Sequence, residues 1–247
     1  HLSGVHLIDL HKPLYHRPDL FADALHPNAE GAEILAQTVY SAMTGNYGGL
    51  SLPAIYSDHM VIQRDKPFVL HGTANASSKI TAQLGKEKQH TTTAPDGTWK
   101  LTFKPRKATR EPITLTISDG DTTLTRTNIL VGEVWLCSGQ SNMVFMLRQA
   151  TNAKENIAEA LTKKDLRIYD MRPRVYTDAI NWDSISLVKL NRLDYYLPTQ
   201  WQTLTTDNAP QFSAIAYHFG AMLADSLDIP IGLICNAVGG APIESFI

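Results

Sequence analysis

The sequence has little of what marks several large classes of protein. Only two of its 247 residues are cysteine, Cys137 and Cys235, which excludes a scaffold held together by many disulfides. Its longest apolar runs, such as IPIGLIC, are far shorter than the roughly 20 residues that cross a bilayer. With a net charge of −2, it has no positive excess for binding nucleic acid or an anionic membrane. What remains is an ordinary globular composition, with 43% hydrophobic and 19% charged residues.

The length and the ends of the chain set its expected organisation. At roughly 100–200 residues per domain, the chain allows one large domain or two small ones. It begins with His1, no signal peptide precedes its first strand, and it stops at Ile247 just after a helix begins. We therefore expect a fragment cut at both ends. Both cysteines end apolar, strand-like runs, so we expect two buried free thiols, which do not identify the cellular compartment.

Residues 1–45 are expected to form a strand, a loop and a helix. GVHLIDL, at residues 4–10, reads as a short apolar strand, and a segment rich in proline and histidine follows it. Apolar residues then recur with helical spacing. Asn28 is the expected N-cap of this helix and Gly45 its expected C-terminal stop. Residues 46–52 have the composition of a linker.

Residues 53–130 switch to a two-residue period. Short runs rich in threonine, valine, isoleucine and aromatic residues, such as KITAQL and WKLTF, alternate with turn sequences such as APDGT and SDGDT. No segment with helical spacing interrupts them. We therefore predict a small antiparallel β domain, a β-sandwich.

Residues 131–247 change pattern again, to strands that alternate with helices. LVGEVWLC is almost continuously apolar, as in a parallel strand that is covered on both faces. It is followed by a helix over NAKENIAEAL, a strand over LRIYDM, an irregular stretch at 172–210, a helix over SAIAYHFGAMLADSL and a strand over IPIGLIC. This order is typical of the opening of a doubly wound α/β sheet, here incomplete at Ile247.

Ser141, in LCSGQSNM, is the candidate nucleophile. The first parallel strand ends at about Cys137, the chain turns through Gly139, and Ser141 is expected where a loop meets a helix N-terminus. Open α/β sheets bind their ligands at this edge, and a helix N-terminus offers free N–H groups that favour an oxyanion. The alternative is a serine that only caps the helix. The surrounding residues do not match the GxSxG elbow of the α/β-hydrolases.

GEVWLCSGQSNM resembles the nucleophile block of the SGNH hydrolases, in the variant found in sialate O-acetylesterases and related carbohydrate acetylesterases. Four further segments are similar to other blocks of that family and occur in the same order. They are LPAIYSDHMVIQRDKPFVLHG, PDGTWKLTF, FSAIAYHFGAMLAD and IPIGLICNAVGGAPIESF. The resemblance covers about residues 50–247. It implies an SGNH-type α/β sheet and a serine esterase that uses no metal or other cofactor. Gln140 and Asn142 flank the serine in this block and are interpreted as shaping the loop.

By this resemblance Ser141 is the nucleophile, and its N–H, together with one from the Gly239–Gly240 loop, forms part of the oxyanion hole. Such donors contribute roughly 3–4 kcal/mol each in acyl transfer. The other interpretation of the glycines is a tight turn. The family commonly has Trp before the glycine pair and Thr or Ser after it, whereas this chain has Val238 and Ala241. We therefore expect an auxiliary hydroxyl contact to be lost while the backbone donors survive.

A serine hydroxyl also needs a base to take its proton. The family supplies that base from a later block that resembles Asp-x-x-His, and no such block follows Ser141 in this chain. His218 is the only later histidine. Its place in an apolar helix favours a packed core residue over a base.

Asp23 and His26, in DALHPNAEG, resemble the terminal block of an SGNH hydrolase, in which the aspartate orients a histidine that acts as the base. The amphipathic helix that follows fits such a domain end. A helix-capping loop and a metal site are the alternatives. The metal site is disfavoured because no HExxH or cysteine pair brings ligands to one point. The other residues here with metal-binding side chains are His6, His11, His16 and Asp19.

The two resemblances together predict a tandem of two esterase modules. In this arrangement Asp23 and His26 belong to the site of the preceding domain and do not serve Ser141. The alternative is a permuted single domain, in which His26 completes the site of Ser141. The predicted units are a remnant of the preceding SGNH domain (residues 1–45), a linker (46–52), the β-sandwich (53–130) and the N-terminal part of a second catalytic domain (131–247).

The leading hypothesis is an esterase that removes O-acetyl groups from sugars through an acyl-enzyme on Ser141. Sialic acid is the first substrate expected and plant acetylated polysaccharide the second. A rival of another class is a carbohydrate-binding or structural module with Trp99 as a sugar platform, although the position of Trp99 on an alternating strand favours core packing. Tyr195, Tyr196 and Trp201 are candidates for lining the substrate cleft. The resemblance also implies a secreted or periplasmic protein.

Overall fold

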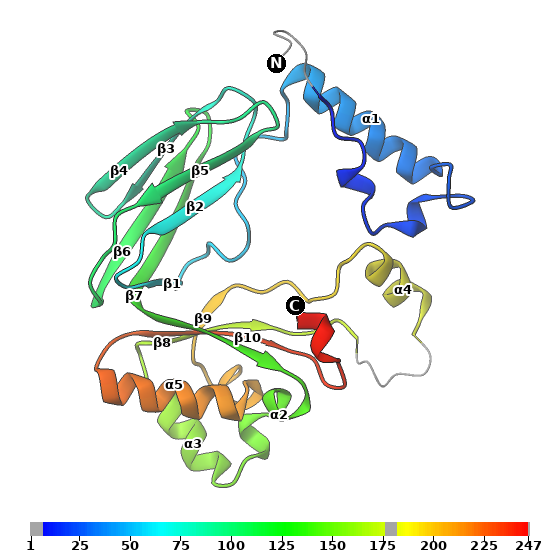
Figure 1. The fold of residues 1–247 in the computed structure, drawn as a ribbon. Helices are drawn as coiled ribbons and strands as arrows, with labels where there is room; N and C mark the ends of the chain where they lie inside the picture. Colours follow the sequence, from blue (N-terminus) through cyan, green and yellow to red (C-terminus); the bar gives the residue numbers. More distant parts are fainter. Residues whose placement is uncertain (1–6, 176–181, 247) are drawn as a thin grey trace.

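The computed structural model describes residues 7–175 and 182–246, and in these residues two β-sheets combine with helices and short turns (Figure 1). The strands are β1 (Val61–Gln63), β2 (Phe68–Thr73), β3 (Lys79–Leu84), β4 (Glu87–Thr92), β5 (Thr98–Phe103), β6 (Thr109–Ser118), β7 (Thr123–Gly139), β8 (Leu166–Met171), β9 (Trp201–Thr203) and β10 (Ile231–Ala237). The α-helices are α1 (Ala29–Thr44), α2 (Ser141–Val144), α3 (Ala153–Ala160), α4 (Ser184–Asn191) and α5 (Ala214–Leu227).

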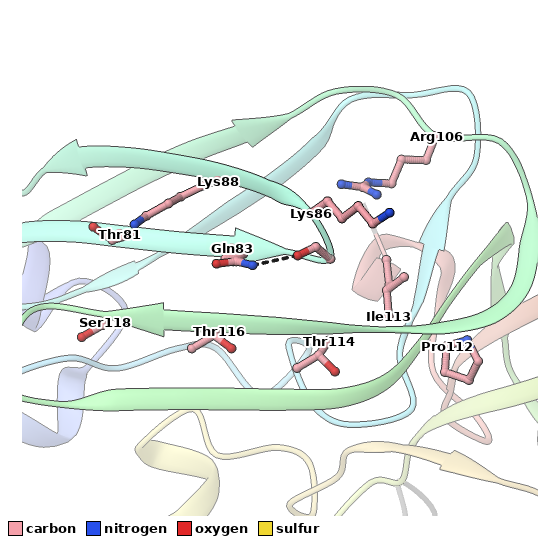
Figure 2. Close-up of a pocket in the computed structure, with 11 residues that line it drawn as sticks. Thr81, Gln83, Lys86, Lys88, Arg106, Pro112, Ile113, Thr114, Thr116 and Ser118 are labelled. Carbon is pink, nitrogen blue, oxygen red and sulfur yellow. Dashed lines mark hydrogen bonds between the residues drawn. The ribbon is translucent and has the colours of Figure 1, made fainter.

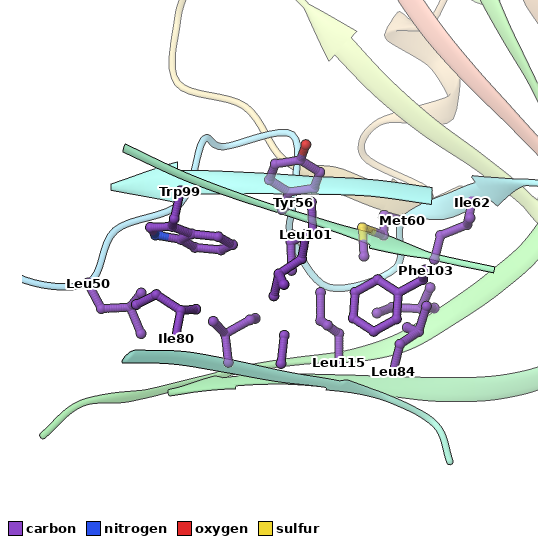
Figure 3. Close-up of a cluster of buried hydrophobic side chains, with 14 of the residues drawn as sticks. Leu50, Tyr56, Met60, Ile62, Ile80, Leu84, Trp99, Leu101, Phe103 and Leu115 are labelled. Carbon is purple, nitrogen blue, oxygen red and sulfur yellow. The ribbon is translucent and has the colours of Figure 1, made fainter. Parts of the chain in front are cut away.

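The β-rich half consists of two sheets that face each other. Strands β4, β3, β6 and β7 pair antiparallel in that order, and β2 pairs with β5 in a smaller sheet. The two-residue period of the sequence places alternate side chains between the sheets. Trp99, Leu101 and Phe103 of β5 meet Ile80 and Leu84 of β3 there (Figure 3). Trp99 is therefore a core residue, as its position on an alternating strand predicted, and cannot serve as a sugar platform.

Strand β7 runs through both halves of the molecule. Its first part pairs with β6 and β1, and its last part, from Glu133 onward, pairs with β10. The apolar run LVGEVWLC is thus only the second part of a 17-residue strand. The change of sequence pattern at 130/131 lies inside this strand and does not coincide with a loop.

The α/β half has the parallel order β7–β10–β8, with the short strand β9 antiparallel at the edge. The predicted strands over LRIYDM and IPIGLIC and the predicted helices correspond to β8, β10, α3 and α5. In Figure 1, α2, α3 and α5 lie on one side of this sheet. On its other face, Tyr169 and Trp201 join the core of the β-rich half. Helices on both faces, as in a doubly wound sheet, are thus not seen in the described residues.

The N-terminal segment departs from its prediction at one point. Residues 7–10 are not a strand, because the Asp9 carboxylate accepts the backbone N–H groups of His11 and Lys12 and turns the chain. The rest of the expected strand, residues 4–6, lies outside the described residues. Helix α1 follows as predicted, with Asn28 as its N-cap and Gly45 in the left-handed conformation at its C-terminal end.

The stretch 172–210 is less irregular than its sequence indicated. It contains α4 and β9, and its residues 176–181 lie outside the described structure. Helix α4 begins after Asp183, whose carboxylate accepts the N–H of Ser186 at 2.9 Å as an N-cap. Among the described helices, none is long and apolar enough to cross a bilayer.

Candidate active site

Ser141 lies at the end of β7, as its sequence context predicted. The strand ends at Gly139, and α2 begins at Ser141. Gly139 has a φ of 150°, where a side chain is strained, so the sharp exit from the strand depends on glycine. The Ser141 side chain is exposed. It therefore has the position and the accessibility that a nucleophile requires.

Helix α2 is only one turn long, from Ser141 to Val144. A single turn has a weak dipole, because the macrodipole is the sum of many aligned peptide units. An oxyanion at this position would therefore be stabilised by individual N–H groups near the serine and not by a helix dipole.

The Gly239–Gly240 loop lies directly beside this turn. Strand β10 pairs in parallel with β7 up to Ala237 opposite Gly139, and the N–H of Val238 donates to the carbonyl of Gly139 at 3.0 Å. Gly240 has a φ of 77°, which is the left-handed conformation that favours glycine. The two strand ends thus bring the loop and the serine together, although they are about a hundred residues apart in the sequence.

Asp23 and His26 form the hydrogen-bonded pair that their motif predicts. The Asp23 Oδ2 atom lies 2.8 Å from Nδ1 of His26. The other carboxylate oxygen, Oδ1, accepts the backbone N–H groups of His26 and Leu25. These bonds, led by the one from the His26 N–H, hold the pKa of Asp23 below its usual value. A carboxylate that holds a histidine through Nδ1 is the arrangement of a general base.

The structure does not bring this pair to Ser141. The pair directly precedes α1, which lies at the upper right of Figure 1, whereas α2 lies at the bottom with α4 and the C-terminal turn between them. The Ser141 hydroxyl has no hydrogen-bond partner among residues 7–175 and 182–246. The permuted arrangement requires contact between His26 and Ser141, and the described structure does not show it.

The remaining candidate residues, Gln140, Asn142 and His218, are all exposed. Gln140 and Asn142 lie on either side of Ser141, and the carbonyl of Gln140 accepts the N–H of Val144. His218 was expected in the core, but it is exposed on α5, because the buried stripe of this helix runs through Ala214, Tyr217 and Ala221. The apolar composition of the helix hid this exposed position.

A cavity of about 600 Å³ adjoins the Gly239–Gly240 loop and was not predicted as such. Tyr195 and Tyr196 line it, in agreement with their predicted place in a cleft. Trp201 does not, because it is buried and its indole N–H donates to the carbonyl of Ile55. The N-cap Asp183 ahead of an apolar run was a sequence signal for α4, which forms one wall of the cavity. The lining residues are Pro173, Val175, Trp182, Leu190, Asn191, Tyr195, Tyr196, Val238, Ala241 and Ser245.

A second hollow, of about 680 Å³, lies on the outer face of β3 and β6 in the β-rich half (Figure 2). Threonines and lysines line it, among them Thr81, Thr116 and Lys88. No candidate catalytic residue reaches it, so it is not part of this site.

Within the described residues, no group of three or more His, Cys, Asp or Glu side chains gathers as metal ligands, and His6 of the N-terminal cluster lies outside them.

The fold is a mixed α/β fold similar to that of a carbohydrate acetylesterase. A solved carbohydrate acetylesterase from Xanthomonas citri superimposes on 80% of this chain with a TM-score of 0.68 and 26% sequence identity, and the match covers 42% of that protein. No protein-family model matches the sequence.

The sequence relatives narrow the class. The sialate O-acetylesterase of Rattus norvegicus is 29% identical over 208 residues, or 79% of this chain, and that of Homo sapiens is 28% identical over 80% of the chain. The chain is thus sialate O-acetylesterase-like, as its motifs indicated. It spans 37% and 39% of the length of these two relatives.

Proposed function

We propose that Ser141 is the nucleophile of a serine esterase that hydrolyses O-acetyl groups of carbohydrates. The observation that carries the proposal is the juxtaposition of Ser141, at the end of β7, with the Gly239–Gly240 loop, at the end of β10. The relatives are sialate O-acetylesterases, and the solved neighbour is a carbohydrate acetylesterase. Sialic acid and acetylated polysaccharide are therefore the two substrate classes to compare.

The reaction would proceed through an acyl-enzyme. The Ser141 oxygen attacks the acetyl carbonyl carbon, and the proton of the serine passes to a base. The bond from this carbon to the sugar oxygen then breaks, and the base gives the proton to that oxygen, so that the sugar leaves as an alcohol. The negative charge on the carbonyl oxygen is stabilised by N–H groups of Ser141 and of the Gly239–Gly240 loop. A water molecule then attacks the acyl-enzyme and releases acetate. We propose that the base lies outside the described surroundings of Ser141.

We further propose that Asp23 and His26 are the acid–base pair of a separate site. In this proposal residues 1–45 end one SGNH-type domain, and 46–52 link it to a β-sandwich at 53–130 and a second SGNH-type domain at 131–247. The formed Asp23–His26 hydrogen bond supports this arrangement, as does the separate placement of α1, which directly follows the pair, and α2 in Figure 1. The same resemblance supports a secreted or periplasmic location, which cell fractionation of the source organism would test.

The direct test replaces Ser141 in the full-length protein. Ser141→Ala should lower the rate of acetate release from an acetylated sugar by about 10⁴-fold or more, because the reaction loses its nucleophile. Ser138→Ala is the matched control, since Ser138 is also an exposed serine at the end of β7. Unchanged activity in Ser141→Ala would refute this role and would favour a non-catalytic carbohydrate-binding module.

A second experiment tests the separation of the two sites. The 247-residue chain alone should hydrolyse p-nitrophenyl acetate little faster than buffer, since no base reaches Ser141 in the described structure. His26→Ala should leave this low rate unchanged. Rapid turnover that disappears in His26→Ala would show that one site contains both residues, as in the permuted arrangement.

A further inference from the structure

We propose that the cavity beside the Gly239–Gly240 loop binds an uncharged O-acetylated sugar, of the kind found in acetylated neutral polysaccharides, in preference to a sialic acid. The proposal rests on the esterase function proposed for Ser141 and names its substrate class.

The cavity lies where the substrate of Ser141 would have to bind. Val238 and Ala241, which flank the glycine pair, form part of its wall. The hydrogen bond from Val238 to Gly139 places this wall beside the turn that leads to Ser141. Its volume of about 600 Å³ is in the usual range for a small-molecule site. A sugar in this cavity would therefore lie next to the candidate nucleophile.

The surface of the cavity suits a sugar ring. Trp182, Tyr195 and Tyr196 supply three aromatic side chains. Aromatic rings offer large apolar faces, against which the C–H face of a pyranose can pack, and tyrosine adds a polar edge. The Tyr196 hydroxyl donates to Oδ1 of Asn236 on β10 at 2.8 Å, which fixes this ring against the strand end. Trp182 and Tyr195 are the more exposed of the three rings.

The charge of the cavity excludes a carboxylate from strong binding. None of its described lining residues is charged. Four basic residues are near the lining residues in sequence, and each is paired with a carboxylate. Arg174 donates to both carboxylate oxygens of Asp194, at 2.8 and 2.9 Å, and Arg172 donates to Asp170 at 2.6 Å. Lys189 lies 3.5 Å from Asp194, and Arg192 lies 3.0 Å from Glu30.

A sialic acid carries a negatively charged carboxylate, which a neutral sugar lacks. Its carboxylate would lose water on entering the cavity and would find no cation in exchange, which is costly. Proteins that bind carboxylates tightly usually supply an arginine for this purpose. An acetylated xylose or hexose unit carries no such charge and loses nothing by the absence of a cation.

The test measures binding with turnover blocked. The 247-residue chain carrying Ser141→Ala is titrated by calorimetry with an acetylated xylo-oligosaccharide and, separately, with a 9-O-acetylated sialic acid. We expect the neutral ligand to bind at least about tenfold more tightly, a difference of about 1.4 kcal/mol. Equal or tighter binding of the sialic acid, or no binding of either ligand, would overturn the proposal.

A pair of tryptophan variants tests the location. Trp182→Ala should weaken binding of the neutral ligand about tenfold, because it removes an aromatic face. Trp135→Ala is the matched control, because Trp135 is similarly exposed, at 42% against 38% for Trp182, but packs against Phe219 of α5. Equal affinities of the two variants, with both folded by circular dichroism, would refute binding in this cavity.

A failure of the substrate proposal can be distinguished from a failure of the catalytic proposal. If Ser141→Ala leaves acetate release unchanged in the full-length protein, the catalytic role of Ser141 is wrong, whatever the ligands do. If Ser141→Ala abolishes release but the sialic acid binds more tightly, the esterase stands and only the substrate class is wrong.

Discussion

Cys137 and Cys235 lie directly opposite each other on the neighbouring strands β7 and β10. Both are free and buried, as the apolar runs around them predicted. Burial raises the pKa of the Cys137 thiol. Burial, together with the charge of Asp170, raises the pKa of Cys235 to about 12. A raised pKa keeps a thiol in its neutral form, which is a poor nucleophile.

We predict that both thiols react slowly with a disulfide reagent while the protein is folded. At pH 8 only about one Cys235 in 10⁴ is ionised if its pKa is about 12, so the folded protein should react very slowly with a disulfide reagent. Raising the pH from 7 to 9 should not bring Cys235 close to full ionisation. Absorbance of the released thiol measures the rate. In guanidinium chloride both cysteines should react quickly, and rapid labelling of the folded protein would contradict the prediction.

At the scale of elements, the start of α1 depends on Asn28. Its side-chain oxygen accepts the N–H of Gly31 at 3.0 Å, and its amide nitrogen donates to the carbonyl of Asp19 at 2.7 Å. Its backbone N–H donates to the carbonyl of Leu20, a fully buried residue. One residue therefore caps the helix and ties it to the preceding turn.

We predict that Asn28→Ala destabilises α1 by about 1–2 kcal/mol, because it removes the cap. Amide hydrogen exchange in α1 should become about 5–30-fold faster, which is the same free energy expressed as an equilibrium. Asn28→Asp keeps an acceptor for Gly31 but loses the bond to Asp19, so its effect should be intermediate. Unchanged exchange in Asn28→Ala would show that the cap contributes nothing.

The elements also show how far the sequence could be interpreted. Strong periodicity correctly predicted β5, β8, β10 and α5, because alternating or helical burial leaves a clear pattern in the residue types. The strand predicted at 4–10 was wrong in its described part, because Asp9 forms local hydrogen bonds that compete with a strand. Helix α4 was missed, although Asp183 was available as its N-cap.

The candidate site was predictable only in part. The position of Ser141 follows from a strand that ends in Gly139 and is a local property of the sequence. The indole N–H of the buried Trp201 donates to the backbone carbonyl of Ile55, a residue that is distant in the sequence. The composition of an aromatic-rich stretch cannot distinguish such a core tryptophan from one in a cleft, such as Trp182.

At the scale of the whole molecule, the two halves meet where β7 crosses between them. The N–H of Arg64 donates to the carbonyl of Gly132 at 2.7 Å, and the Arg64 guanidinium bonds the Glu133 carboxylate at 2.6 Å. The N–H of Glu133 donates to the carbonyl of Pro230 at 3.0 Å. Backbone of three segments therefore converges on one point of the strand.

Gly132 is the residue at this point that cannot carry a side chain. A Cβ atom there would overlap the carbonyl oxygen of Pro230 and lie 2.6 Å from its carbonyl carbon. Both are backbone atoms, so no side-chain rotation can relieve the clash. The same oxygen accepts the N–H of Glu133, so moving Pro230 would also break a bond that joins the two halves.

We therefore predict that Gly132→Ala lowers the free energy of unfolding by about 3 kcal/mol, at the upper end of overpacking effects. For a chain of this size, the melting temperature should fall by about 6–12 °C in calorimetry. Gly239→Ala is the matched control, because a Cβ atom at Gly239 meets no atom within 4 Å, so its stability should change by less than about 0.5 kcal/mol. Equal melting temperatures for the two variants would show that the crossing of β7 is not a rigid joint between the halves.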